Sequence, residues 1–326
     1  TDMSRLFLNK TTFNDDISSW DVSSVTNMSY MFDNASSFNG DISSWDVSSV
    51  TNMIAMLRST SFNQDISDWD VSSVNNMGSM FYNASSFNQD ISSWDVSGVG
   101  SMSGMFRSAS SFNQDISSWD VSSVTSMWLM FRDAVSFNQN LSNWDVSSVT
   151  DMSGLFMNVS SFNYDISDWD VSSVTAMPYM FYNATSFNQD ISNWDVANVV
   201  YANNMFSSAT SFNQDISNWD VSNVTHMNNM FSGTAGLSDA NKCLIHVSFQ
   251  SNDAWPYNWF EFCDFTAITQ NNIQAAVDLW VSDNAAALST YGPINSWDVS
   301  LITDMSQLFF NKTTFNDDIG NWDVSN

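Results

Sequence analysis

Apolar residues recur through residues 1–234 with a repeat of 25 positions, F-N-x-D-I-S-x-W-D-V-S-x-V-T-x-M-x-x-M-F-x-x-A-x-x, and their spacing changes within each copy. In the first copy Trp20 and Val22 alternate with Asp21, and a period of two predicts a short strand with one buried face. A Ser after the strand would cap a helical segment of two or three turns. The apolar residues of that segment have helical spacing, and they are Val25, Met28, Met31, Phe32 and Ala35.

The tryptophans mark the period, because successive ones lie 25 residues apart except where one residue is missing between Trp45 and Trp69. They are Trp20, Trp45, Trp69, Trp94, Trp119, Trp144, Trp169, Trp194 and Trp219. Such a repeat predicts a solenoid whose turns cover one another's apolar side chains. We interpret the Trp and Met columns as core, although Met stripes also occur on metal-binding and docking surfaces. The predicted fold class is α/β, a leucine-rich-repeat-like solenoid with a short parallel strand and a short helix per turn, interrupted by an aperiodic capping segment.

The repeat predicts three parts of the chain: a solenoid block of about ten turns at 1–234, a cap or junction at 235–293, and the first turns of a second block at 294–326. Residues 303–325 repeat residues 1–23 with only four differences. We therefore expect one period of a longer, polymer-like polypeptide made of blocks of about 302 residues.

Between the blocks the period disappears, and we expect caps for the apolar ends of the solenoid. Cys243 and Cys263 are the only cysteines of the chain, and a disulfide between them would close the cap of the first block in an oxidising compartment. A metal pair or two free thiols are the alternatives. Residues 271–282 have the apolar spacing of an amphipathic helix, which we expect to cap the second block.

The charge of the chain is strongly acidic, with a net charge of −28 and only seven basic residues. This balance argues against binding nucleic acid or an anionic membrane. No apolar run approaches the roughly 20 residues that a membrane-spanning helix needs, so we expect no membrane insertion. Nearly all the acidic residues are Asp, which favours turns, capping or cation ligation over solvated helix faces.

Aspartates form two columns, one between the Trp and Val of each repeat and one before the Ile. Like charges on neighbouring turns repel, so something must offset the repulsion. Either each carboxylate accepts hydrogen bonds from turn amides and Ser hydroxyls, or calcium ions bridge successive turns. We expect no required cofactor, with calcium as the candidate cation. In the first block, the first column holds Asp21, Asp46, Asp70, Asp95, Asp120, Asp145, Asp170, Asp195 and Asp220, and the second holds Asp16, Asp41, Asp65, Asp90, Asp115, Asp165, Asp190 and Asp215. In the second block, Asp298 and Asp323 continue the first column and Asp318 continues the second.

Asparagines recur at two positions of the repeat. The Asn after each Phe, from Asn14 to Asn213, is expected to form a ladder that satisfies backbone groups of the turns. A second Asn column carries N-glycosylation sequons. An Asn in the left-handed conformation that ends a helix would explain the same column without a glycan. The sequon column holds Asn9, Asn34, Asn83, Asn158, Asn183 and Asn311.

The repeat resembles the 25-residue surface-protein repeat of the BspA-like leucine-rich-repeat superfamily, of the Mycoplasma-lipoprotein type, over residues 1–234 and 295–326. The resemblance implies a secreted or cell-surface protein associated with adhesion and matrix contacts, with no shared enzymatic activity. The sequence departs from the repeat at Asn140, which replaces the Asp before the strand, and at residues 200–202, where Val-Tyr-Ala replaces T-x-M.

The sequence contains few residues of the kinds that carry out catalysis, and we do not expect the chain to be an enzyme. His226 and His246 are the only histidines, neither lies beside a recognisable nucleophile or carboxylate pair, and the sequence has no phosphate-binding Gly loop.

Two functions remain from the sequence. The first is a structural building block of an extracellular or cell-surface filament, whose partners are copies of itself joined head to tail and cap to cap. The second is a surface adhesin or ligand-binding ectodomain that contacts glycans or matrix. Ice or mineral binding is a weaker third option. The residues of a binding site should vary from turn to turn on one face. The solvent-side positions of the expected strand instead remain Asp, Ser and Asn, and this uniformity favours the filament.

Overall fold

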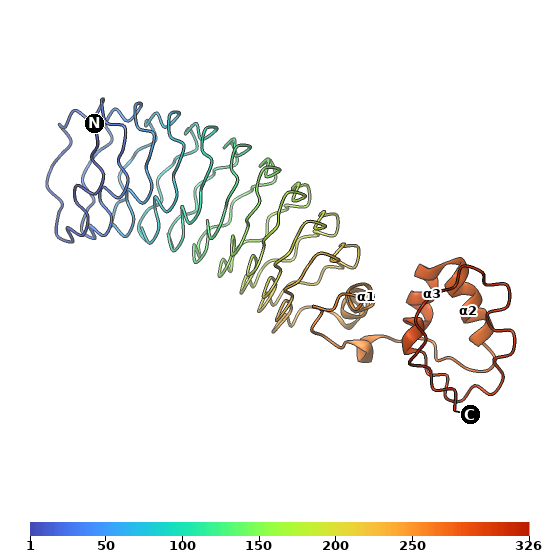
Figure 1. The fold of residues 1–326 in the computed structure, drawn as a ribbon. Coiled ribbons are helices and arrows are strands. Elements are labelled where there is room, and N and C mark those ends of the chain that lie inside the picture. Colours follow the sequence, from blue (N-terminus) through green and yellow to red (C-terminus); the bar gives the residue numbers. More distant parts are fainter. Residues whose placement is uncertain (326) are drawn as a thin grey trace. The chain divides into compact units, whose positions relative to one another are not determined.

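The computed structural model describes residues 1–325 and consists of two compact units. Unit 1 comprises Thr1–Leu237 and Asn252–Pro256, and unit 2 comprises Ser238–Ser251 and residues 257–325. Unit 1 is a solenoid in which consecutive turns of similar shape stack on one another (Figure 1). The repeat therefore predicts the stacking correctly.

The predicted α/β class is wrong. The described part of the chain contains no named strand, and its helices all lie outside the repeats of unit 1. The helices are α1 (Asp239–Phe249), α2 (Ile273–Ser282) and α3 (Asn284–Tyr291), with short 3-10 helices at Phe260–Phe262 and Ile294–Ser296. The solenoid is instead made of reverse turns, joined by one isolated parallel β-bridge between each pair of neighbouring turns, from Asp2↔Asn27 to Tyr201↔His226.

The segment predicted as a helix cannot be one, because two residues in each turn have left-handed backbone. In the second turn these are Tyr30 and Asn34, both with φ of 59°. A right-handed helix cannot contain such residues. The N–H groups of alternate residues leave the turn: those of Met28, Tyr30, Phe32 and Asn34 donate to carbonyls of the following turn at 2.7–3.0 Å.

The remaining N–H groups of the same segment close reverse turns on the residue three positions earlier. Met31 donates to Met28, and Ala35 donates to Phe32. Residues three apart thus lie on the same side, as they do in a helix, and this is why the apolar spacing imitates a helical one. The apolar residues are buried as expected, but the backbone between them is different.

The predicted strand is likewise replaced by reverse turns. The N–H of Trp20 donates to the carbonyl of Ile17 at 3.1 Å, and that of Val25 donates to Val22 at 2.8 Å. The alternation of buried and exposed residues is correct, because Trp45 and Val47 are buried while Asp46 between them is exposed. No inter-turn backbone hydrogen bond joins these residues to a sheet within the described chain.

The core of unit 1 consists of columns of identical side chains, as predicted. Phe81 stacks on Phe87 within its turn at 3.8 Å and on Phe106 of the next turn at 5.6 Å between ring centroids. The Met columns of the interior turns are fully buried, so the alternative of a Met docking surface is wrong. The last turn is covered by residues 252–256, where Asn252 Nδ2 donates to the carbonyls of Val221 and Val224 at 2.6 and 2.9 Å.

Unit 2 has a core of its own, formed by α2, α3 and the second copy of the repeat. The apolar face of α2 buries Ile273, Ala276, Val277 and Trp280, the positions that the sequence spacing indicates. Side chains near the start of this helix bind the repeat that follows it. Gln270 Nε2 donates to the carbonyl of Asp304 at 2.8 Å, and Gln274 Nε2 to that of Leu308 at 3.3 Å.

Candidate functional site

The aspartates of the two acidic columns are stabilised within their own turns by hydrogen bonds, in nearly every case from Ser. Asp46 Oδ1 accepts the N–H of Ser48 at 3.1 Å and its hydroxyl at 2.6 Å. The second column has the same geometry, since Asp41 Oδ1 accepts the N–H of Ser43 at 3.0 Å. These bonds favour the ionised form of each carboxylate.

The pKa values of Asp46 and Asp41 are lowered by this geometry. The Ser48 hydroxyl, and then its N–H, lower the pKa of Asp46, whereas desolvation and the carboxylates of the neighbouring turns raise it less. At Asp41 the N–H of Ser43 contributes most to the lowered pKa, followed by its hydroxyl. Repulsion along the column is thus present, but the local hydrogen bonds outweigh it.

The negative charge is dispensable for the turn itself. Asn140 replaces an aspartate of the second column, and its Oδ1 accepts the N–H of Ser142 at 2.9 Å. Because an uncharged amide makes the same turn, the charge of the columns is not explained by the local backbone alone.

No group of three or more His, Cys, Asp or Glu among residues 1–325 is arranged to hold a metal ion. Each aspartate of the columns instead uses Oδ1 for the local turn. Calcium binding along the columns therefore stays a prediction.

The six sequon asparagines all have left-handed backbone, with φ between 55° and 63°. They do not end helices, however, because the repeats contain none. Four of the side chains, those of Asn34, Asn83, Asn158 and Asn183, donate to the preceding turn, as when Asn34 Nδ2 donates to Asn9 Oδ1 at 2.9 Å and Asn158 Nδ2 to Asp133 Oδ1 at 2.6 Å. Nδ2 is also the atom to which a glycan would be attached. A glycan replaces one of its two hydrogens, so the remaining N–H would have to make the hydrogen bond to the preceding turn. Glycosylation stays a prediction.

The asparagine ladder is confirmed, with one interruption. In most turns Oδ1 of one Asn accepts the backbone N–H of the next, as from Asn113 to Asn88 at 2.9 Å. A Gln after the Asn adds a second donor, as when Gln139 Nε2 reaches Asn113 Oδ1 at 3.0 Å. Asn138 Oδ1 is the exception, because it is buried without a hydrogen-bond partner. The following turn carries Tyr164 in place of Gln.

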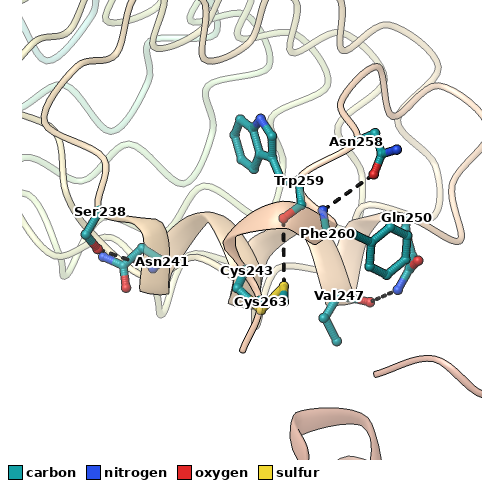
Figure 2. The surroundings of a disulfide bond; sticks show 9 residues. All are labelled: Ser238, Asn241, Cys243, Val247, Gln250, Asn258, Trp259, Phe260 and Cys263. Atoms are coloured by element: carbon teal, nitrogen blue, oxygen red, sulfur yellow. Dashed lines mark hydrogen bonds between the residues drawn. A yellow bond between two sulfur atoms is a disulfide. The ribbon is translucent and has the colours of Figure 1, made fainter. Parts of the chain in front are cut away.

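The predicted disulfide is present in unit 2. It joins Cys243 of α1 to Cys263 just after the 3-10 helix at Phe260–Phe262, with the Cα atoms 5.0 Å apart (Figure 2). Ser238 caps α1 by accepting the N–H of Asn241 at 3.2 Å. The alternatives of a metal pair and of free thiols are therefore wrong for this structure.

The two histidines lie in different surroundings. His246 of α1 is buried, its ring meets that of Phe260 edge to face at 4.4 Å, and burial lowers its pKa. His226 is exposed, and its Nδ1 lies 2.8 Å from the hydroxyl of Thr225. Neither arrangement resembles a catalytic pair, and the absence of enzymatic activity stays an expectation.

Sequence reasoning missed one surface, which we call the variable face. It consists of four columns of the repeat, those of Asn27, Ser29, Tyr30 and Asp33, and these positions differ from turn to turn. All four arginines of the chain lie in these columns, and so do Trp128 and five of the eight tyrosines: Tyr30, Tyr82, Tyr179, Tyr182 and Tyr201. The variation of these four columns is visible in the sequence. The predicted helix, however, groups the positions incorrectly, so sequence reasoning did not place them on one surface.

The side chains of the variable face contact one another along the solenoid. The guanidinium groups of Arg58 and Arg107 lie 5.8 and 4.8 Å from the ring centroid of Tyr82. Arg58 Nε also pairs with Asp33 Oδ1 at 2.7 Å, and Arg132 Nε pairs with Asp133 at 3.1 Å.

Comparison with known families gives one result. The model of a family described as "Mycoplasma protein of unknown function, DUF285" matches residues 1–80, 58–152, 136–242 and 279–326. None of the curated proteins matches the sequence. Among residues 1–325, no helix combines the length and the apolar character needed to cross a membrane.

Proposed function

The chain belongs to the family described as "Mycoplasma protein of unknown function, DUF285", and we propose that it is a structural building block of an extracellular or cell-surface filament made of tandem repeat blocks. The likeness of its repeat to BspA-like surface repeats supports the location. The assembly is supported by the recurrence of residues 1–23, with four differences, at residues 303–325, because tandem blocks in one register repeat the same junction.

One side of each turn carries a row of hydrogen-bond acceptors. In the interior, the carbonyls of Asn27, Ser29, Met31 and Asp33 accept N–H groups from the preceding turn. In unit 2, the side chains of Gln270 and Gln274 supply donors to two of the equivalent carbonyls. The segment before the second copy of the repeat thus binds its acceptor row, and a tandem array of blocks would repeat this contact at each junction.

The other side of each turn carries a row of donors, because the N–H groups of Met28, Tyr30, Phe32 and Asn34 reach the following turn. A row of donors and a row of acceptors favour each other as edge strands do. The two sides of a turn differ, so a contact between blocks is heterologous and extends without closing unless the rotation forms a ring.

Electron microscopy of the purified chain tests the proposal. We expect head-to-tail filaments that lengthen with protein concentration, and we expect Phe7→Asp to shorten them because it places a charge in an apolar column beside the acceptor row. Leu301→Asp is the matched control, since Leu301 is 82% exposed and lies outside the acceptor and donor rows. Single particles at all concentrations would contradict end-to-end assembly.

A surface adhesin or ligand-binding ectodomain is the second candidate. The observation that favours it is the turn-to-turn variation of the variable face, where a solenoid of fixed geometry presents different side chains. Binding to a panel of glycans and matrix proteins, lost on substitution of Trp128, would support this candidate over the filament.

A further inference from the structure

We propose that the variable face docks onto the acidic columns of a second copy of the chain, so that solenoids associate side by side. The inference rests on the proposed filament, because it adds a lateral contact to the end-to-end one. It concerns different residues, and the two contacts can therefore fail separately.

The centre of the variable face is a cluster of cations and rings on four successive turns, from Arg58 to Arg132. Tyr82 lies between Arg58 and Arg107, and both guanidinium groups are within 6 Å of its ring, a distance at which cation–π attraction holds them in place. Trp128, one turn beyond Arg107, is 45% exposed. Arg, Tyr and Trp are the residues that contribute most at protein interfaces.

Arg107 is the arginine of this cluster that lacks a counter-ion. Arg58 pairs with Asp33 and Arg132 pairs with Asp133, whereas Arg107 pairs with no carboxylate of residues 1–325. Its Nε is buried without a hydrogen-bond partner, while the side chain as a whole is only half-buried. A guanidinium fixed by stacking is preorganised to bind a carboxylate, because little conformational freedom remains to be lost.

The acidic columns of another copy supply carboxylates at the matching interval. Each interior turn carries an exposed aspartate whose Oδ1 binds the local Ser, as in Asp120 with Ser122. Arg107 and Arg132 are one turn apart, and Arg58 and Arg107 are two turns apart. Since two copies have the same rise per turn, these arginines meet aspartates of the partner in register. A polysaccharide or an unrelated protein has no reason to share this interval.

The net charge of −28 sets the conditions for this contact. Two such chains repel each other at long range, and only local pairs attract. At about 0.15 M salt the Debye length is roughly 8 Å, so distant repulsion is largely screened while close pairs persist. We expect lateral association to be strongest at intermediate salt, and weaker at about 10 mM and at about 1 M, where the Debye lengths are roughly 30 and 3 Å.

The experiment compares Arg107→Gln with Ser123→Glu by sedimentation velocity and electron microscopy at intermediate salt. Both variants change the net charge by one unit in the same direction. Ser123 is exposed and lies outside the variable face. We expect Arg107→Gln to raise the concentration needed for side-by-side association about tenfold, the effect of roughly 1.4 kcal/mol, and Ser123→Glu to leave it unchanged or lower it.

The acidic columns are tested separately with two triple variants. Asp95→Asn, Asp120→Asn and Asp145→Asn neutralise three central residues of the first column, and Asp90→Asn, Asp115→Asn and Asp165→Asn neutralise three of the second. Asn keeps the local turn, as Asn140 already does. We expect one of the two triples to abolish lateral association while the melting temperature stays close to that of the wild type.

The outcomes separate the two contacts. Single filaments of normal length in Arg107→Gln, with bundles in the wild type, support the lateral contact. Bundles that persist in Arg107→Gln and in both triples overturn it and leave the filament standing. Lateral pairs without filaments support the docking surface and overturn the proposed function. A wild type that stays unbundled at every salt concentration overturns the inference, and binding of a foreign protein or glycan by the variable face would then assign it to the second candidate.

Discussion

The indole Nε1 of Trp119 donates a 3.0 Å hydrogen bond to the carbonyl oxygen of Ile91, which belongs to the preceding turn. The same bond recurs along the solenoid, for example from Trp94 to Ile66 at 3.0 Å and from Trp144 to Ile116 at 3.1 Å. Each Trp thus fills the core and also satisfies a buried carbonyl. This explains why the column holds Trp in every repeat rather than another large apolar residue.

Replacing Trp119 by Phe should lower the free energy of unfolding by about 1–3 kcal/mol. Phe loses the bond to Ile91 and part of the packing, while the carbonyl keeps the N–H of Trp94 at 3.2 Å. Trp20→Phe is the control, because the Trp20 indole makes no hydrogen bond within residues 1–325 and its side chain is partly exposed. Chemical denaturation checks both variants, and equal losses would contradict a role for the inter-turn bond.

Replacing Tyr164 by Gln should stabilise the solenoid by about 0.5–1.5 kcal/mol. The Gln amide would donate to Asn138 Oδ1, which is buried and unpaired, as Gln139 donates to Asn113. Gln139→Tyr is the reciprocal variant and should destabilise. If Tyr164→Gln leaves the denaturation midpoint unchanged, the unpaired oxygen is satisfied in another way in solution.

The stability of the solenoid should fall at acidic pH because the folded pKa values of aspartates such as Asp46 lie below the ordinary value of 3.8. A carboxyl whose pKa is depressed on folding stabilises the protein above its unfolded pKa, and this contribution is lost as the pH falls through the folded pKa. The melting temperature should therefore be flat near neutral pH with respect to these groups and decrease below a pH of about 4.

Ser48→Ala should raise the pKa of Asp46 towards its ordinary value, because the Ser48 hydroxyl is the first cause of the lowered pKa. The turn should persist, since Asp195 accepts the N–H of Ala197 at 3.1 Å without any hydroxyl. Carboxyl NMR titration measures the change. An unshifted Asp46 resonance would contradict the role of the hydroxyl.

Removing divalent cations should leave the melting temperature unchanged at about 10 mM salt, where charges act over roughly 30 Å. The carboxylates of the columns already have local donors, so the turns do not depend on a bridging ion. A fall in melting temperature with chelator, restored by calcium, would instead support calcium between turns.

Reducing the disulfide between Cys243 and Cys263 should destabilise unit 2 by about 3 kcal/mol, as expected for a loop of this size. The bond joins residues 20 apart in the sequence. Unit 1 contains neither cysteine, so its unfolding should change little. Intact mass with and without reduction and alkylation checks the bond, and two alkylatable thiols in the unreduced protein would contradict it.

The sequence by itself determined the period, the stacking and the buried columns. A position such as Phe106 or Trp119 is apolar in every turn because every turn covers its neighbours there, and this requirement leaves a visible period. The cysteine pair and the amphipathic face of α2 are also local patterns, and the structure contains both.

Only the tertiary structure decided the backbone of the repeat and the surface it presents. Reverse turns that close on the residue three positions earlier place apolar side chains as a helix does, so the spacing alone cannot separate the two. The left-handed conformation of Tyr30 is unusual for a bulky residue, and it occurs because its N–H reaches the carbonyl of Ile54 in the next turn. That contact joins residues 24 positions apart. Contacts of this kind between turns place Arg58, Tyr82 and Arg107 on one face, and no short stretch of the sequence shows that these residues lie together.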